Sequence, residues 1–181
     1  SYEFFAPATS SATARCIDVY ALEEVWHKFV FDASAAFLHV PEQEYVVCDP
    51  PDEWKKQQAA AGMDSEGQLW VMMRTLYGRR PAAQAWKEWL AHDLCERCGL
   101  ERDEAVPTLY RWPGRTVRVD VHSDDGHGCG TPEDISEFLE TLGQNVLVKT
   151  GGPYGPGDTY SHLGRERTLG ASTVVIRPAR K

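Results

Sequence analysis

One short stretch, TVRVDVHSDDGHGCG at residues 116–130, constrains the fold of this chain more than any other. Its first half alternates valine with polar residues, which is the period of a β-strand with one buried face. Asp124 and Asp125 then stand side by side where a turn is expected. The glycines that follow them predict a returning strand to which a backbone or a ligand comes close. The stretch therefore predicts a β-hairpin with an acidic tip.

Two segments with helix signals enclose this hairpin. Residues 81–99 carry an apolar stripe, with Pro81 suited to the first helical position and Gly99 to the residue after the last turn. Residues 131–143 begin with Thr131, a good N-cap, followed by a proline. Strand patterns are present at 25–32, 45–51, 68–78, 108–112, 145–149 and in two terminal segments within 160–178, and a flexible loop is expected at 151–157.

The order of these segments predicts an α+β fold of the split βαβ (ferredoxin-like) type, an antiparallel sheet with helices packed on one face. In this topology the first and third strands are neighbours at the sheet centre. Asp32, at the end of the first strand, then lies at the same edge as Asp124 and Asp125. Crowded carboxylates are costly unless a cation neutralises them. We expect the three to bind two Mg²⁺ or Mn²⁺ ions, and the glycines after Asp125 to let a nucleic-acid backbone approach.

Other interpretations of the same residues stay open. An Asp-Gly pair is a common hairpin signal, so the acidic turn taken alone is explained by solvation. His122 and His127 flank the aspartates and suit a zinc or manganese site. Cys95 and Cys98 form a C-x-x-C without a second ligand pair, which favours two thiols on a helix over a zinc site.

Composition narrows the class of protein. The chain has 181 residues and a net charge of −8, which argues against a nucleic-acid binder that acts alone. Its cysteine count is odd and no secretory signal is visible, so we expect reduced thiols inside the cell, in the cytoplasm or nucleus. No apolar run approaches the roughly 18 residues of a membrane span, so no membrane partner is expected.

Five segments resemble the palm of copia-type LTR-retrotransposon reverse transcriptases, in the same order and over roughly 165 residues. They are YEFFAPATSSATAR, FVFDASAAFLHVPEQEYVVCDPPDEW, LWVMMRTLYGRRPAAQAWKEWLAHDL, VRVDVHSDDGHGCGT and YSHLGRER. The resemblance implies a palm domain at 1–169, with fingers and thumb absent or incomplete, and a C-terminal strand or tail at 170–181. It implies RNA-directed DNA polymerisation, in which a primer 3′-hydroxyl attacks the α-phosphate of a dNTP.

The resemblance also assigns roles to residues. Asp32, Asp124 and Asp125 match the metal-binding aspartates, and Phe37 matches the aromatic that screens the 2′-position of the incoming sugar. Gly78 matches the segment beneath the templating base, and Arg79 and Arg80 beside it are candidates for phosphate contacts. The implied partners are an RNA or DNA template-primer, dNTPs, and the fingers, thumb and RNase H segments of a Pol polyprotein.

The chain departs from the family pattern at two places. His122-Ser123 stands where the family has Tyr-Val, and Pro81 replaces a glutamine. Proline has no side-chain group that can hydrogen-bond to a nucleotide. The alternative function is therefore a catalytically degenerate palm remnant that serves as a binding or structural module. In that case Phe37 is a core residue, and Arg79 and Arg80 are exposed charges without a function.

Overall fold

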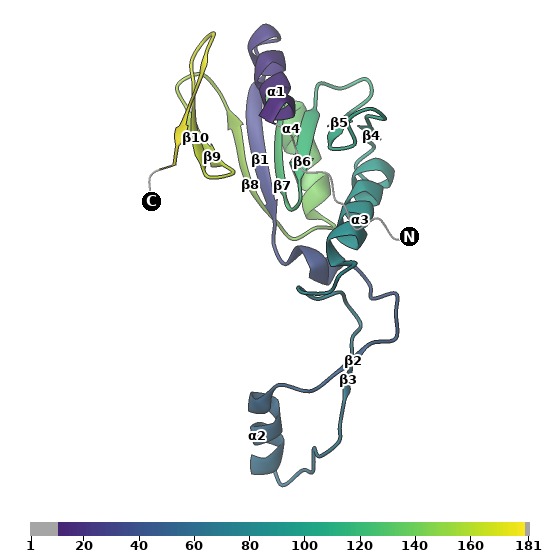
Figure 1. Ribbon diagram of the computed structural model, residues 1–181. Coiled ribbons are helices and arrows are strands. Elements are labelled where there is room, and N and C mark those ends of the chain that lie inside the picture. The colour runs from purple at the N-terminus through teal and green to yellow at the C-terminus, as the bar shows by residue number, and fades with distance from the viewer. Residues whose placement is uncertain (1–10, 180–181) are drawn as a thin grey trace.

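A computed structural model describes residues 11–179 and shows an α+β fold built on an antiparallel sheet (Figure 1). Among these residues the main sheet has six strands in the order β4-β5-β6-β7-β1-β8. The strands are β1 His27–Ala33, β4 Glu101–Arg102, β5 Leu109–Arg111, β6 Arg118–His122, β7 Asp125–Gly130 and β8 Val148–Tyr154. Within residues 11–179, no helix is both long and apolar enough to cross a bilayer.

The central strands follow the predicted split βαβ topology. β1 lies between β7 and β8 and is antiparallel to both, while β6 pairs with the far side of β7. The two predicted helices are present as α3, Ala82–Glu96, and α4, Pro132–Gly143. The side chain of Thr131 accepts a hydrogen bond from the Asp134 amide, so the expected N-cap forms. The fold class predicted from the sequence is confirmed.

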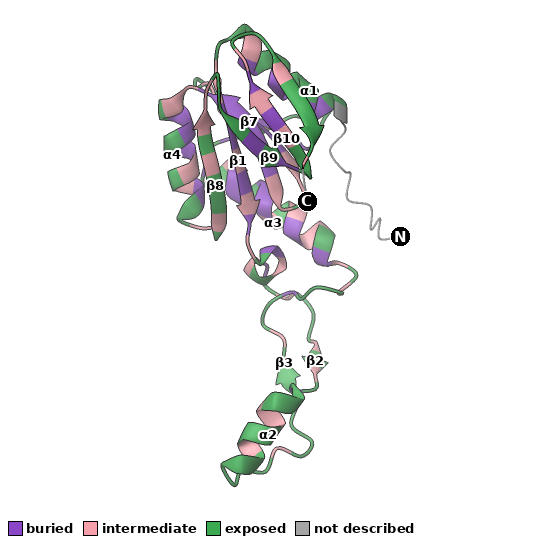
Figure 2. Cartoon of the chain, turned by 90° about the vertical axis from the view of Figure 1, so that its left-hand side faces the viewer, coloured by how far each residue is buried: buried purple, intermediate pink, exposed green. Residues whose placement is uncertain are grey.

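The main core lies between this sheet and the pair α3 and α4, where Figure 2 shows the buried residues gathered. Phe29 and Phe31 of β1 pack against Phe138 of α4, with ring centroids 5.6 and 6.3 Å apart. A Cβ at Gly126 would lie 2.1 Å from Phe31, and one at Gly128 would lie 2.3 Å from Phe29. These two glycines therefore admit phenylalanine rings. The expectation that they let nucleic acid approach is wrong, because the space beside them is filled by the core.

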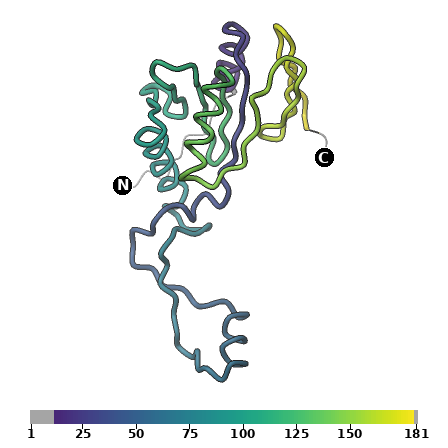
Figure 3. Tube along the Cα trace, turned by 180° about the vertical axis from the view of Figure 1, so that it is seen from behind, coloured from purple at the N-terminus to yellow at the C-terminus, as the bar shows by residue number. Residues whose placement is uncertain are grey.

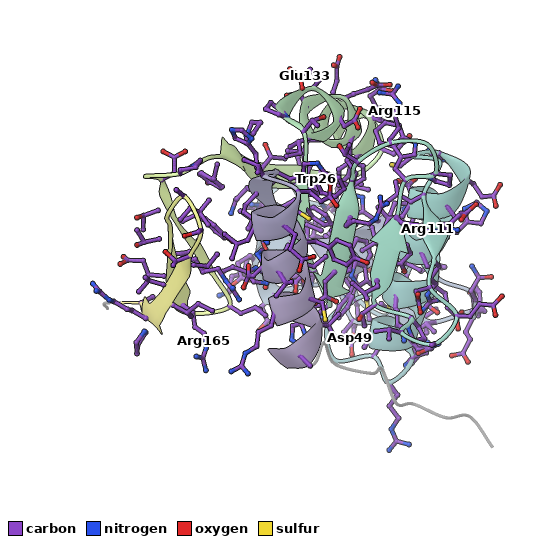
Figure 4. The ribbon with its side chains drawn as sticks, turned by 90° about the horizontal axis from the view of Figure 1, so that it is seen from above. Trp26, Asp49, Arg111, Arg115, Glu133 and Arg165 are labelled. Carbon is purple, nitrogen blue, oxygen red and sulfur yellow. The ribbon has the colours of Figure 1, made fainter. Side chains whose placement is uncertain are left out.

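A helix that was not predicted, α1 Ser11–Glu23, lies across the opposite face of the sheet (Figure 4). Ile17 and Ala21 pack against Cys129 of β7, and Trp26 closes the cluster. Adjacent strand residues point to opposite faces, so Gly128 faces α4 while Cys129 faces α1. The small residues of α1 make a weak apolar stripe in the sequence. The first segment that resembles the copia family lies partly outside the described residues, at 2–10.

A second sheet covers the same face as α1. It consists of β9 Thr159–His162, β10 Arg165–Leu169 and β11 Val174–Pro178, in the order β11-β10-β9. β11 pairs with β10 along its length, so the segment predicted as a C-terminal strand or tail at 170–181 contains a strand that shares a sheet with the preceding one. The loop predicted at 151–157 is shorter than expected, because residues up to Tyr154 belong to β8.

Residues 41–80 form an arm that projects from the body, as Figures 2 and 3 show. The arm contains β2 Val47–Cys48, α2 Asp52–Ala60 and β3 Trp70–Val71, and α2 has no buried residue. The strands predicted at 45–51 and 68–78 were too long, because only Val47–Cys48 and Trp70–Val71 pair as strands. Their aromatic and β-branched residues have high strand propensity, but the arm offers them no further strand to pair with.

A buried polar cluster joins α1, the main sheet and the second sheet. It comprises Asp18, Lys28, His127, Tyr160 and Arg167. The Asp18 carboxylate lies 3.0 Å from Lys28 Nζ and 2.5 Å from Arg167 Nη1. His127 Nε2 is 2.8 Å from the Tyr160 hydroxyl, and the rings of His127 and His162 stack with centroids 4.9 Å apart. Lys28 and Arg167 are only 1% and 5% exposed, so water cannot solvate their charges. The Asp18 carboxylate is therefore the counterion of both buried cations.

We expect Asp18→Asn to lower the free energy of unfolding by about 3–5 kcal/mol, because it leaves both cations buried without an anion. Urea denaturation of the wild type and the variant measures this difference. Glu104→Gln, at an exposed position, is the matched control and should change stability by less than about 0.5 kcal/mol. Equal stability of Asp18→Asn and wild type would mean that the cluster does not hold the layers together.

A pH dependence follows from the buried histidine His162. Burial, and secondarily Arg167, lowers its pKa from 6.5 to about 4. Between pH 6.5 and 4, the imidazole of His162 is therefore protonated in the unfolded chain but neutral in the folded chain. Above pH 6.5 the ring is neutral in both states and does not affect the free energy of unfolding. As the pH falls from 6.5 toward 4, protonation of the unfolded chain lowers this free energy by on the order of 2 kcal/mol. His162→Gln should flatten the dependence of unfolding free energy on pH in this window, whereas His92→Gln, at an exposed position, should not.

Candidate metal and nucleotide site at the hairpin tip

Four ionisable residues form a row across four adjacent strands, next to the β6–β7 turn. His122 of β6 pairs with Asp125 of β7, which pairs with Asp32 of β1, which pairs with Lys149 of β8. Directly opposed residues on antiparallel strands share a face, so all four side chains leave the sheet on the same side. We call this set the acidic row. It lies on the face opposite Phe31 and Gly126.

Electrostatics couple the members of the acidic row. Burial, the Asp124 carboxylate and the Asp32 carboxylate raise the pKa of Asp125, in that order, while His122 lowers it. Asp32 has a counterion, because its Oδ2 lies 3.9 Å from Nζ of Lys149. Lys149 is 80% exposed, so this contact is weak and easily exchanged. Asp125 is thus the residue at which the repulsion from Asp124 and Asp32 raises the pKa.

The turn that carries Asp124 consists of Ser123 and Asp124 and is held by two hydrogen bonds; we call these two residues the hairpin tip. The Trp86 indole N–H donates to the Ser123 carbonyl at 3.0 Å, and the Ala33 amide donates to the Asp124 carbonyl at 2.8 Å. Ser123 has a φ of 58°, an unusual value for a residue other than glycine, which these contacts maintain. In the sequence, Trp86 is only one member of the apolar stripe of residues 81–99. Nothing in its spacing reveals the hydrogen bond.

The three aspartates predicted to bind metal are brought to one edge of the sheet, as the topology required. Their carboxylate oxygens suit Mg²⁺ or Mn²⁺ in chemical type. In the part of the chain that the structure describes, however, no group of three or more His, Cys, Asp or Glu side chains converges on a common point. Binding of a cation by all three would therefore require the side chains to turn toward each other.

The predicted nucleotide-contact residues lie beyond β1, where the arm joins the body. Phe37 lies in the short 3₁₀ helix η1, Ala36–His39, and its ring centroid is 4.5 Å from that of Tyr77. Gly78 follows Tyr77 with a φ of 91°, which favours glycine. Phe37 is half-buried and packs against the main core, so it is partly the core residue of the alternative interpretation. Tyr77 was not singled out in the sequence, although it precedes Gly78 directly.

The two predicted phosphate-binding arginines have different surroundings. Arg79 binds two carboxylates of the arm, Glu42 at 3.2 Å and Glu44 at 2.7 Å. A phosphate would have to displace these partners. Arg80 is exposed.

The fold gives the histidines and cysteines of the alternative metal sites different surroundings. His127 is fully buried, belongs to the polar cluster and has a pKa far below the usual value because of burial, whereas His122 lies in the acidic row. Cys98 is buried and its pKa is raised to about 12, mainly by burial, so its thiol stays protonated. Cys95 lies in the last turn of α3 and Cys98 just beyond it, which agrees with two thiols at a helix end.

Comparison with known proteins supports the fold and leaves the family open. No protein-family model matches the sequence, and none of the curated proteins matches it. Among solved structures, the chain is similar to an apo telomerase from Candida tropicalis truncated from its C-terminal domain. The TM-score is 0.54 at 10% identity, over 93% of this chain and 40% of that one. A likeness at this identity establishes a polymerase-like α+β fold for this chain, which spans less than half the length of the telomerase.

Proposed function

We propose that this chain is the palm region of a retroelement reverse transcriptase of the copia type, in which Asp32, Asp124 and Asp125 hold two Mg²⁺ or Mn²⁺ ions for nucleotidyl transfer to a primer. The observation that carries the proposal is the direct cross-strand pairing of Asp32 with Asp125, beside Asp124 in the turn. The polymerase-like fold and the order of the copia-like segments support the same conclusion. A template-primer, dNTPs and other Pol segments are the proposed partners, in the cytoplasm or nucleus.

In this proposal, different residues would bind the metal ions, hold the turn and balance charge. When bound, the metal ions supply electrostatic stabilisation of the charge that develops during phosphoryl transfer. Asp32 and Asp125 provide oxygen ligands from neighbouring strands of a rigid sheet, and Asp124 provides a third from the turn. Trp86 holds the turn in place through Ser123. Lys149 neutralises Asp32 in the absence of metal and would be released when a divalent cation takes its place.

Metal binding tests the site directly. Mn²⁺ should broaden the amide NMR signals of Asp32, Asp124 and Asp125 selectively, and Asp125→Asn should weaken the affinity about 100-fold by removing a charged ligand. The affinity should also fall as the pH is lowered through the raised pKa of Asp125, since a protonated carboxyl group does not bind metal. Glu140→Gln, an exposed substitution on α4, is the control and should bind as the wild type does.

Primer extension tests the reaction. With Mg²⁺ or Mn²⁺, the chain supplemented with the fingers and thumb of a copia-type polymerase should add dNTPs to a primed RNA template, and Asp124→Asn should reduce incorporation to background. Incorporation unaffected by Asp124→Asn would exclude these aspartates from the chemistry.

A binding or structural module remains the second candidate, and three observations favour it. Arg79 is already paired with Glu42 and Glu44, and Pro81 replaces the expected glutamine. The arm also exposes large apolar side chains, among them Tyr45, Leu69 and Met73. Exposed apolar surface of this kind marks interaction sites. Absence of dNTP incorporation, together with partner binding that Asp124→Asn leaves unchanged, would establish this second function.

A further inference from the structure

A cavity of about 210 Å³ lies between α3 and strands β5 and β6, next to the hairpin tip. Its floor is buried and consists of Trp86, Leu90, Thr108 and Tyr110, and Val121 forms part of the wall. An apolar cavity of about 150 Å³ is large enough to bind benzene. This cavity therefore has room for one aromatic ring and a short substituent.

The rim of the cavity is half-buried or exposed and carries positive charge. Lys87 lines it, and burial, followed by the charge of Arg102, lowers the pKa of this lysine. Arg102 lies close by, over the ring of Tyr110 at 5.9 Å from the centroid. The neighbouring acid Glu88 accepts a hydrogen bond from Gln84 at 2.6 Å. The charge of Glu88 only partly offsets this lowering of the Lys87 pKa, so an anion at the rim would further stabilise the charged lysine.

One wall of the cavity is also the support of the hairpin tip. Trp86 and Ser123 both line the cavity, and the indole N–H of Trp86 donates to the Ser123 carbonyl at 3.0 Å. Asp124 follows Ser123 directly. A molecule packed against the Trp86 ring would hold the indole in place, and with it the turn that carries the two adjacent aspartates.

We propose that this cavity binds a small aromatic acid, with the ring between Trp86 and Tyr110 and the acidic group at Lys87, and that its occupancy is transmitted to the hairpin tip through the hydrogen bond from Trp86 to Ser123. The cavity borders the acidic row, because His122 lines both, but its other lining residues lie outside the row. It depends on neither metal binding nor nucleotidyl transfer.

Phenylacetate is a suitable probe because it combines one aromatic ring with a carboxylate. Titration of the chain, followed by amide and indole NMR signals without divalent cations, should give saturable shifts at Trp86, Ser123 and Asp124. A ligand of this size is expected to bind with a Kd on the order of 1 mM. 2-Phenylethanol, the neutral analogue, should shift the same signals but bind about tenfold more weakly.

Two substitutions on the exposed side of α3 separate the contributions of charge and shape. Lys87→Met should weaken phenylacetate about tenfold and leave 2-phenylethanol unchanged, because it removes only the charged partner. Ala83→Phe should prevent binding of both probes by narrowing the mouth of the cavity, whereas Gln84→Phe, at the adjacent position outside the lining, should not. Lys56→Met, on α2 of the arm, is the control for loss of an exposed lysine.

Phenylacetate shifts that do not saturate, or that are unchanged in both Lys87→Met and Ala83→Phe, would overturn the proposal. Saturable binding without any shift at Ser123 and Asp124 would overturn the transmission to the hairpin tip. Because the titration contains no metal and no nucleotide, its outcome is independent of whether the acidic row binds Mn²⁺.

Discussion

The antiparallel pairing of β1 with β7 is the interaction on which the rest of the structure depends. On one face it places Phe29 and Phe31 over Gly128 and Gly126, which have no side chain to obstruct the rings. On the other face the same register places Asp32 opposite Asp125. A shift of one residue would drive the phenylalanines out of the core, so burial of these rings also determines where the carboxylates meet. The candidate site is thus positioned by hydrophobic packing on the reverse side of the sheet.

The face that carries the acidic row is divided into two electrostatic regions. Beneath α1 and the second sheet, Asp18, Lys28 and Arg167 are buried and compensate each other. At the hairpin end of the same face, Asp125 and Asp32 are partly exposed, and their repulsion is only partly relieved by Lys149 and His122. A carboxylate with a raised pKa at an accessible edge, such as Asp125, is typical of a functional site, whereas the closed cluster joins the layers of the fold.

Helix α3 connects the main core, the candidate site and the cavity. Its inner face contributes Trp86 and Leu90 to the main core. The polar edge of the Trp86 ring supports the turn, and the same residue forms the floor of the cavity. Side chains in a close-packed interior have few alternative positions, so a change in the cavity is passed on to the turn. The arm shows the contrast, because α2 has no buried residue and contacts β3 through the edge-to-face pair of Trp54 and Trp70.

The sequence by itself determined the elements whose signals are local. Pro81 and Gly99 bounded α3 closely, Thr131 marked the start of α4, and the alternating valines of β6 identified a strand with one buried face. From the order of these elements, the split βαβ topology and the meeting of Asp32 with the acidic turn could be predicted.

Only the tertiary structure decided features that depend on contacts between distant segments. α1 is stable because it packs on Cys129, more than a hundred residues away in the chain, and its small residues give no strong periodic signal. The glycines of β7 gave no indication that phenylalanine rings from β1 fill the space beside them. Neither Lys149 nor Trp86 was singled out as a site residue in the sequence, although Lys149 contacts Asp32 and Trp86 supports the turn. Their roles arise from register and packing, which bring together groups that no local pattern in the sequence connects.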